Sequence, residues 1–183
     1  MPFESIDMTA STLKEAATGI KPAEKNELAQ KLVAAYSEQQ AIVNQIKAAR
    51  WNNQGARAAE FAQLLAAAAP EAACQPSQYQ ARQNQTVQPF PPSYQIAERI
   101  SVFGRRVPSD YNELFEYSRI EDPQTQETYQ NAEAIAKACE TFAQTARHTI
   151  KLAQQADDPV TAQVMTAQLQ TAEQLATQLR RFE

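Results

Sequence analysis

The chain has 183 residues, a formal net charge of −4 and 43% hydrophobic residues. This length suits one domain with a continuous apolar core, and the presence of only 3 glycines favours helices over a sheet with tight turns. The negative charge argues against a surface that grips nucleic-acid phosphates. Because no apolar run approaches the ~18 residues of a membrane span and no apolar leader is evident, we expect a cytoplasmic protein.

The predicted elements start after an N-terminal tail, residues 1–21. In residues 22–50 the apolar side chains recur at spacings of three, four and seven, which predicts a long amphipathic helix. The turn-forming segment WNNQG follows, and the alanine-rich residues 56–74 predict a second helix. Residues 75–92 are rich in proline and glutamine and have no clear period, so they predict an inserted loop.

Shorter elements come next. A helix is expected from Ser93, with Ile96 and Ile100 on one face, and a small helix after Ser109, which could act as its N-cap. Two long helices are then predicted to begin where an aspartate precedes a proline, at Asp122 and at Asp158. The short turn QQADDP makes these two helices antiparallel, so residues 22–183 are predicted to form an all-α four-helix bundle.

Several stretches resemble the Dps family of mini-ferritins, part of the ferritin superfamily. In LAQKLVAAYSEQQAIVNQIKAARWNNQG, the residues Trp51, Asn52 and Gly55 match the family's His-Trp-Asn-x-x-Gly motif at the end of its first helix. Residues 140–183 resemble the third and fourth helices around their acidic turn and Thr-Ala sequence. IAERISVFG resembles the end of the second helix, and residues 111–120 resemble the short dimer-interface helix. The resemblance covers most of residues 25–183, with residues 75–92 as an insertion.

This resemblance implies a ferritin-like four-helix bundle with a short crossover helix, assembled as a cage of twelve subunits. It also implies iron storage, protection against oxidative stress, and a ferroxidase site shared across a two-fold interface. At the positions of its two histidines and its aspartate, this chain has Arg50, Ala62 and Ala66. Glu98 alone matches a metal ligand, and Tyr94 replaces its acidic companion one turn earlier.

One carboxylate cannot hold ferrous iron tightly, and an arginine in the cluster adds a fixed positive charge that repels the ion. We therefore expect the usual ferroxidase chemistry to be absent or weakened, although iron stays the cofactor or cargo that the resemblance implies. Because an unpaired buried charge is costly, we also hypothesise that Arg50, which continues the stripe of Val43 and Ile46, pairs with Glu98 across the dimer.

Other candidate residues each have a plain structural alternative. The resemblance implies that Asp157 and Asp158 help to line an ion pore, but Asp158 is equally explained as a helix cap. The single histidine, His148, is predicted to face away from the core, as a solvated or subunit-contact residue rather than a ligand. The cysteines Cys74 and Cys139 form no Cys-x-x-Cys pair and predict idle thiols.

The aromatic residues Trp51, Tyr111 and Tyr117 could quench radicals or stack on a ligand, but at helix ends and interfaces aromatic residues more often act as packing anchors. The family often protects DNA through a lysine-rich tail. Here the lysines of residues 1–25 are balanced by acidic residues, so we do not expect DNA binding by that route.

The sequence leaves three functions open. The first is a Dps-like cage protein associated with iron storage and stress protection, acting alone or with an active paralogue. The second is a pseudo-ferritin that serves as a structural or protein-binding module through residues 75–92. The third is an unrelated helical adaptor that shares only the helix pattern.

Overall fold

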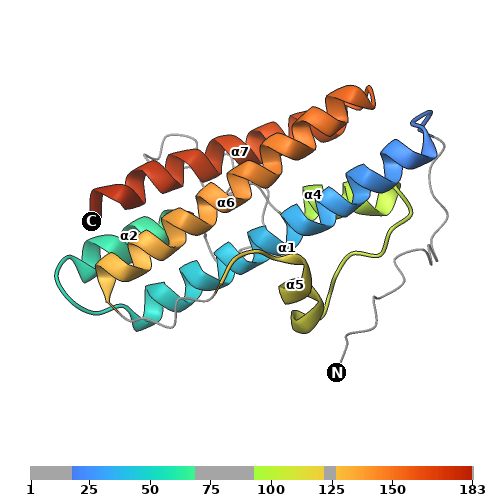
Figure 1. The fold of residues 1–183 in the computed structure, drawn as a ribbon. Coiled ribbons are helices and arrows are strands. Elements are labelled where there is room, and N and C mark those ends of the chain that lie inside the picture. The colour runs from blue at the N-terminus through green and yellow to red at the C-terminus, as the bar shows by residue number, and fades with distance from the viewer. Residues whose placement is uncertain (1–17, 69–92, 122–126, 183) are drawn as a thin grey trace, which may run out of the picture.

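A computed structural model describes residues 18–68, 93–121 and 127–182 of the chain. Three long helices lie side by side: α1 (Pro22–Asn52), α6 (Thr128–Gln155) and α7 (Pro159–Leu179) (Figure 1). The shorter helices are α2 (Ala58–Ala68), α4 (Tyr94–Val102) and α5 (Tyr111–Tyr117), followed at the end by a 3₁₀ turn, η1 (Arg180–Phe182). No strand occurs in these ranges, which confirms the predicted all-α class, and none of their helices has the length and apolarity to cross a membrane.

The fourth position of the bundle is filled by two short helices. Both α2 and α4 contact α1, at opposite ends of the bundle, and α4 also contacts α7 (Figure 1). Gln40 donates a hydrogen bond of 2.9 Å to Ser93, and Arg105 donates one of 2.9 Å to Asn26, so α4 runs antiparallel to the first half of α1. The predicted loop of residues 75–92, and the predicted second helix beyond Ala68, lie outside the described residues.

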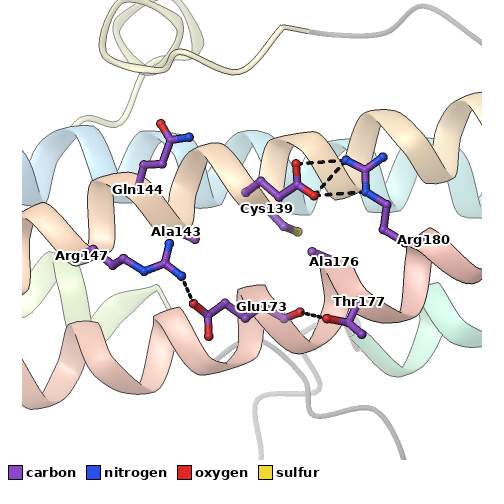
Figure 2. Close-up of a pocket in the computed structure, with 9 residues that line it drawn as sticks. Cys139, Ala143, Gln144, Arg147, Glu173, Ala176, Thr177 and Arg180 are labelled. Carbon is purple, nitrogen blue, oxygen red and sulfur yellow. Dashed lines mark hydrogen bonds and ion pairs between the residues drawn. The ribbon is translucent and has the colours of Figure 1, made fainter.

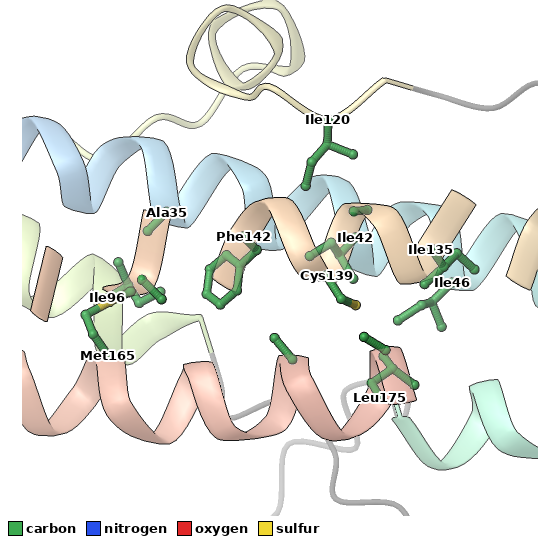
Figure 3. Packing of buried hydrophobic residues seen from close by; sticks show 14 of the residues in the cluster. Ala35, Ile42, Ile46, Ile96, Ile120, Ile135, Cys139, Phe142, Met165 and Leu175 are labelled. Atoms are coloured by element: carbon green, nitrogen blue, oxygen red, sulfur yellow. The ribbon is translucent and has the colours of Figure 1, made fainter. Parts of the chain in front are cut away.

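The core consists of fully buried apolar side chains from every helix except α5 (Figure 3). Side chains at 3–4 spacing on the long helices face inward, as their sequence pattern predicts. Burial of each large apolar side chain stabilises the folded state by roughly 1.5–3 kcal/mol. An isolated helix in water lacks this contribution to its stability. The largest are Leu28, Leu32, Ile42, Ile46, Phe61, Leu65, Ile96, Ile100, Ile135, Phe142, Met165 and Leu175.

The start of α7 is as predicted. Asp158 is the N-cap, because its Oδ1 accepts a hydrogen bond of 3.1 Å from the amide of Thr161, and Pro159 takes the first helical position. The preceding residue, Asp157, has a φ of 53°, and the amide of Asp158 donates to the carbonyl of Ala153 at 2.8 Å. This left-handed turn satisfies carbonyls at the end of α6 and reverses the chain into α7.

The starts of α5 and α6 correct the prediction. Asp110 caps α5 in place of Ser109, since its carboxylate accepts the amide of Asn112 at 2.7 Å. Helix α6 begins at Thr128, whose amide and hydroxyl donate to the carbonyl of Gln54 at 3.1 and 2.8 Å. These contacts hold the chain against the turn after α1, so the helix starts there rather than after Asp122, which lies outside the described residues together with Pro123.

Candidate functional site

The five positions that the resemblance assigns to iron binding are spread over three helices. Arg50 lies in the last turn of α1, Ala62 and Ala66 are half-buried on α2, and Tyr94 and Glu98 lie on α4. Tyr94 and Glu98 are both exposed and one turn apart, so they share one face of α4.

Arg50 and Glu98 of one chain are far apart. Residue Ser93, just before α4, contacts Gln40, and α4 continues from there toward the start of α1. Gln40 precedes Arg50 by ten residues, so Glu98 lies roughly 15 Å or more from Arg50 along the helix axis at the usual rise per residue. A pair between Arg50 and the Glu98 of a second subunit therefore stays a prediction.

Arg50 stacks on its neighbour. Its guanidinium lies 5.0 Å from the ring centre of Trp51, which is 70% exposed. The side chain is half-buried, while Ala49 is the buried residue that follows Ile46 on α1. Arg50 thus lies at the edge of the predicted stripe, and this contact is a cation–π arrangement at an exposed helix end.

The described residues of one chain do not fit a diiron centre. No three histidine, cysteine, aspartate or glutamate side chains in residues 18–68, 93–121 and 127–182 gather where they could hold a metal ion. Such a centre needs several oxygen or imidazole donors that converge on the ions. Glu98, the one matching ligand, would need donors from another subunit.

The aspartate expected at the pore is part of an internal cluster instead. Asp158 is 5% exposed, and its Oδ2 accepts from Arg99 at 2.8 Å and from the Thr161 hydroxyl at 2.5 Å. Arg99 also donates to the Thr161 hydroxyl at 2.9 Å, so the cluster joins α4 to the start of α7. Burial acts to raise the pKa of Asp158, but hydrogen bonds from Thr161 and Arg99 outweigh it and hold the pKa below its usual value.

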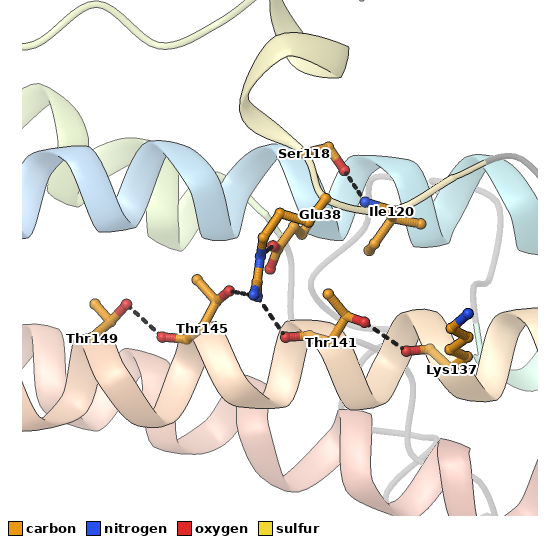
Figure 4. A network of polar contacts seen from close by, with 8 residues as sticks. Glu38, Ser118, Ile120, Lys137, Thr141, Thr145 and Thr149 are labelled. Carbon is orange, nitrogen blue, oxygen red and sulfur yellow. Dashed lines mark hydrogen bonds and ion pairs between the residues drawn. The ribbon is translucent and has the colours of Figure 1, made fainter.

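A second buried carboxylate, which the sequence prediction missed, lies between α1 and α6. The side chain of Glu38 is fully buried, and its Oε1 accepts from the Nε of Arg119 at 2.8 Å. Arg119 also donates to the carbonyl of Thr141 at 3.1 Å and to the hydroxyl of Thr145 at 2.5 Å (Figure 4). Burial raises the pKa of Glu38 above its ordinary value, although hydrogen bonding with Thr145 and the Arg119 guanidinium partly offset this rise.

A third polar contact crosses the centre of the bundle, and it too was not predicted. The amide nitrogen of Gln39 on α1 donates to the amide oxygen of Gln168 on α7 at 3.0 Å, and both residues are buried. The sequence carried a signal for this pair. Gln39 lies seven residues from both Leu32 and Ile46, so it interrupts an otherwise apolar stripe.

The other predicted residues have these positions. His148 and Asp157 are exposed, and the predicted outward orientation of His148 is confirmed. Tyr111 is 67% exposed, whereas Tyr117 is half-buried, and burial raises the pKa of its hydroxyl. Cys139 is fully buried as a free thiol, while Cys74 lies outside the described residues.

A groove between α6 and α7 has a volume of about 490 Å³ (Figure 2). Two ion pairs span it, Glu140 with Arg180 at 2.9 Å and Arg147 with Glu173. Cys139 contributes to its lining. Because both arginines pair with carboxylates across the groove, it offers little free charge to a ligand.

Comparison by sequence finds no match: no protein-family model fits the chain, and no curated protein is similar to it. Comparison by structure finds many. DpsC from Streptomyces coelicolor covers 99% of this chain and 95% of its own, with a TM-score of 0.73 and 15% identity. A Dps protein from Vibrio cholerae O1 covers 91% and 95%, with a TM-score of 0.69 and 16% identity. A dodecameric thioferritin from Bacteroides fragilis covers 86% and 84%, with a TM-score of 0.67 and 15% identity.

The chain has the Dps-like mini-ferritin fold. The predicted ferritin-like bundle with a short crossover helix is confirmed, because α5 connects the α4 side of the bundle to α6 and lies outside the long helices (Figure 1). In this mini-ferritin fold the second bundle helix is represented by α2 and α4.

Proposed function

We propose that this chain forms a Dps-like cage associated with iron storage and oxidative-stress protection in the cytoplasm, with most of its ferroxidase ligands replaced. The observation that carries the proposal is a likeness of fold over nearly the whole length of the Dps proteins. The related bacterial thioferritin is described as dodecameric, and the Vibrio cholerae protein as a ferritin-like diiron-carboxylate protein. These descriptions support a homo-oligomer that handles iron.

The donor set supports a weakened ferroxidase rather than a typical one. The Arg50 guanidinium supplies a positive charge where a neutral imidazole ligand is expected, and Ala62 and Ala66 supply no donor. Among the positions that the resemblance assigns to iron binding, Glu98, exposed on α4, is the one that keeps a metal ligand. Iron uptake would then depend on acidic inner surfaces or on co-assembly with an active paralogue.

The oligomeric state tests the cage directly. Twelve chains of 20.3 kDa amount to about 244 kDa, so native mass spectrometry of the purified protein should give a species of that mass. A monomer or dimer at micromolar concentration would contradict the cage.

Ferrous iron oxidation tests the site. We expect the wild-type protein to oxidise ferrous iron little faster than buffer does, as followed by ferric absorbance. A variant that restores the expected ligands, with Arg50→His, Ala62→His and Ala66→Asp, should gain oxidation if these positions form the site. A matched control places histidines at exposed neighbours, Lys47→His and Gln63→His, and should gain nothing. Fast oxidation by the wild type would show that a ligand set exists elsewhere.

The alternative is a pseudo-ferritin that binds proteins without iron chemistry. The replacement of the expected ligands by Arg50, Ala62 and Ala66 supports it over an active ferroxidase. Residues 75–92 are then the candidate contact segment. A cage that neither oxidises nor retains iron, even with the restored ligands, would favour this alternative.

A further inference from the structure

The segment between α5 and α6 is tied to the bundle by a small set of contacts. We refer to residues 118–121 as the strap. Arg119 binds Glu38 and α6 as described above, and Gln45 on α1 donates to the carbonyl of Glu121 at 2.6 Å. Ile120 is 7% exposed and packs into the core, while its amide donates to the Ser118 hydroxyl at 3.1 Å (Figure 4).

Helix α5 has no fully buried residue of its own, although it contacts α1 and its half-buried Tyr117 packs against the core. Its aromatic side chains Tyr111 and Phe115 are 67% and 59% exposed and lie one turn apart on one face. The other ion pair close to α5 joins Arg106 and Glu113, and Arg106 is exposed to solvent. Contacts of that kind are weak, so the strap is a main attachment of α5 to the bundle, beside the contact of α5 with α1.

In the strap contact between Arg119 and Glu38, the two side chains differ in their exposure to solvent. Glu38 is fully buried, whereas the side chain of Arg119 is 55% exposed. The second carboxylate oxygen of Glu38, Oε2, has no hydrogen-bond partner in the described part of the chain. If Arg119 moves away, the guanidinium can be solvated where it is, but a charged Glu38 would be left buried and unpaired, which is costly.

We propose that Glu38 and Arg119 form a pH-sensitive latch, in which a proton taken up by the Glu38 carboxylate releases the strap and so loosens the attachment of α5 to the bundle. The proton goes to Glu38, Arg119 keeps its own charge and turns to solvent, and the bundle stays folded. This inference concerns a single chain and stands whether or not the chain forms a cage.

The surroundings of Glu38 favour this direction. The strap contributes Arg119 and, two residues later, the exposed Glu121; α6 contributes the neutral Thr141 and Thr145, with the exposed Lys137 one turn earlier. Arg119 is the charged group that acts on Glu38. Without it, the pKa of the buried carboxyl would be higher still, so the open state binds a proton more tightly than the closed state and acid favours opening.

Hydrogen–deuterium exchange of the full-length protein tests the latch, with the Ile120 amide as the main probe. After correction for intrinsic exchange rates, protection of the strap should fall as the pH is lowered from 7 toward the ordinary glutamate pKa of 4.5, with a slope of up to about ten-fold per pH unit for one linked proton. Amides in the centres of α1 and α6 should keep their protection. Native mass spectrometry at the same pH values separates this local opening from any change in assembly.

Two variants decide the outcome. Glu38→Gln, which has nearly the same shape and no charge, should lower strap protection at pH 7 and remove its pH slope. Glu113→Gln, which breaks the exposed pair with Arg106, should leave the slope unchanged. Arg119→Ala should also lose the slope, but the result does not depend on that variant being well folded. A Glu38→Gln protein that kept the wild-type pH slope would overturn the proposal.

Discussion

Arg99 and Asp158 form an ion pair of 2.8 Å that joins α4 to the first turn of α7, two helices separated by more than fifty residues of sequence. The side chains are 14% and 4% exposed, so the pair is largely shielded from water. Because Asp158 is also the N-cap of α7, one carboxylate both starts a helix and attaches it to another. Two consequences for stability follow from this arrangement.

Replacing Asp158 by alanine should destabilise the protein by roughly 2–4 kcal/mol, because it removes a helix cap and leaves Arg99 without its buried partner. Urea denaturation at a fixed protein concentration measures the loss. Asp157→Asn is the matched control: residue 157 is exposed and left-handed, a conformation that asparagine tolerates, so it should change stability by less than about 0.5 kcal/mol. Equal losses for both substitutions would contradict the assigned role of Asp158.

The two buried carboxylates should change the stability of the protein in opposite directions as the pH falls. The pKa of Asp158 is lowered, so its contribution is present above its ordinary pKa of 3.8 and is lost as the pH falls through the lower folded value. The pKa of Glu38 is raised, so its contribution is full below its ordinary pKa of 4.5 and is lost as the pH rises through the folded value.

Stability curves from pH 3 to pH 7 test this contrast. Relative to Glu38→Gln, the wild type should gain stability as the pH falls toward 4.5. Relative to Asp158→Asn, it should lose stability below pH 3.8. The opposite slope in either comparison would show that the burial or pairing of that carboxylate is wrong.

Removing Arg119 should cost more than removing its charged partner. Arg119→Ala leaves Glu38 charged and buried, and we expect a loss of roughly 1–3 kcal/mol at pH 7, reduced because Arg119 is half exposed. Adding Glu38→Gln to that variant should recover most of the loss, since a neutral amide is far cheaper to bury. Arg106→Ala, at an exposed pair, serves as the control and should change stability by less than about 1 kcal/mol. An additive double variant would be inconsistent with a direct contact.

The buried amide pair gives a double-mutant cycle at the centre of the bundle. Gln39→Leu or Gln168→Leu alone leaves a buried amide without this partner and should cost roughly 1–3 kcal/mol. The double variant should cost clearly less than the sum of the two, because both polar groups are then gone. Gln170→Leu, on the exposed face of α7, should have little effect. Thermal and urea unfolding both report these differences.

The thiol of Cys139 should be inert in the folded protein. It is fully buried, and burial raises its pKa far above the ordinary value, so little reactive thiolate forms. In a Cys74→Ser background, a thiol reagent such as Ellman's reagent should give no signal with native protein and one thiol per chain after unfolding. Reaction of the native protein within minutes would mean that the core opens at this point.

Local sequence patterns predicted the helices well, but they could not predict contacts between residues that are far apart in the sequence. The cap at Asp158 depends on residues within one turn, so the sequence was enough to locate the start of α7. The start of α6 was placed too early because Thr128 is held by the carbonyl of Gln54, a contact that no local pattern contains. The cap of α5 was wrong by one residue, since Ser109 and Asp110 are both common caps and only geometry selects between them.

The same limit applies to the candidate site. The replaced ligand positions could be named because the motif around Trp51 gives their register. The ion pair of Glu38 with Arg119 joins residues 81 positions apart. It could not be predicted without knowing where the segment after α5 lies on the bundle. A signal was nevertheless present: Glu38 lies three residues after Ala35 and four before Ile42, a spacing that places its side chain on the same face of the helix as these two apolar residues.

The division of the second bundle helix into α2 and α4 has a practical consequence for protein engineering. Each part carries its own buried side chains, Phe61 and Leu65 in α2 and Ile96 and Ile100 in α4. Phe61 also stacks edge-on against Phe182, with ring centres 5.3 Å apart, so α2 is anchored at the end of the chain as well. A polypeptide cut between α2 and α4 would therefore yield two fragments that each retain core contacts, which makes this chain a candidate for fragment complementation.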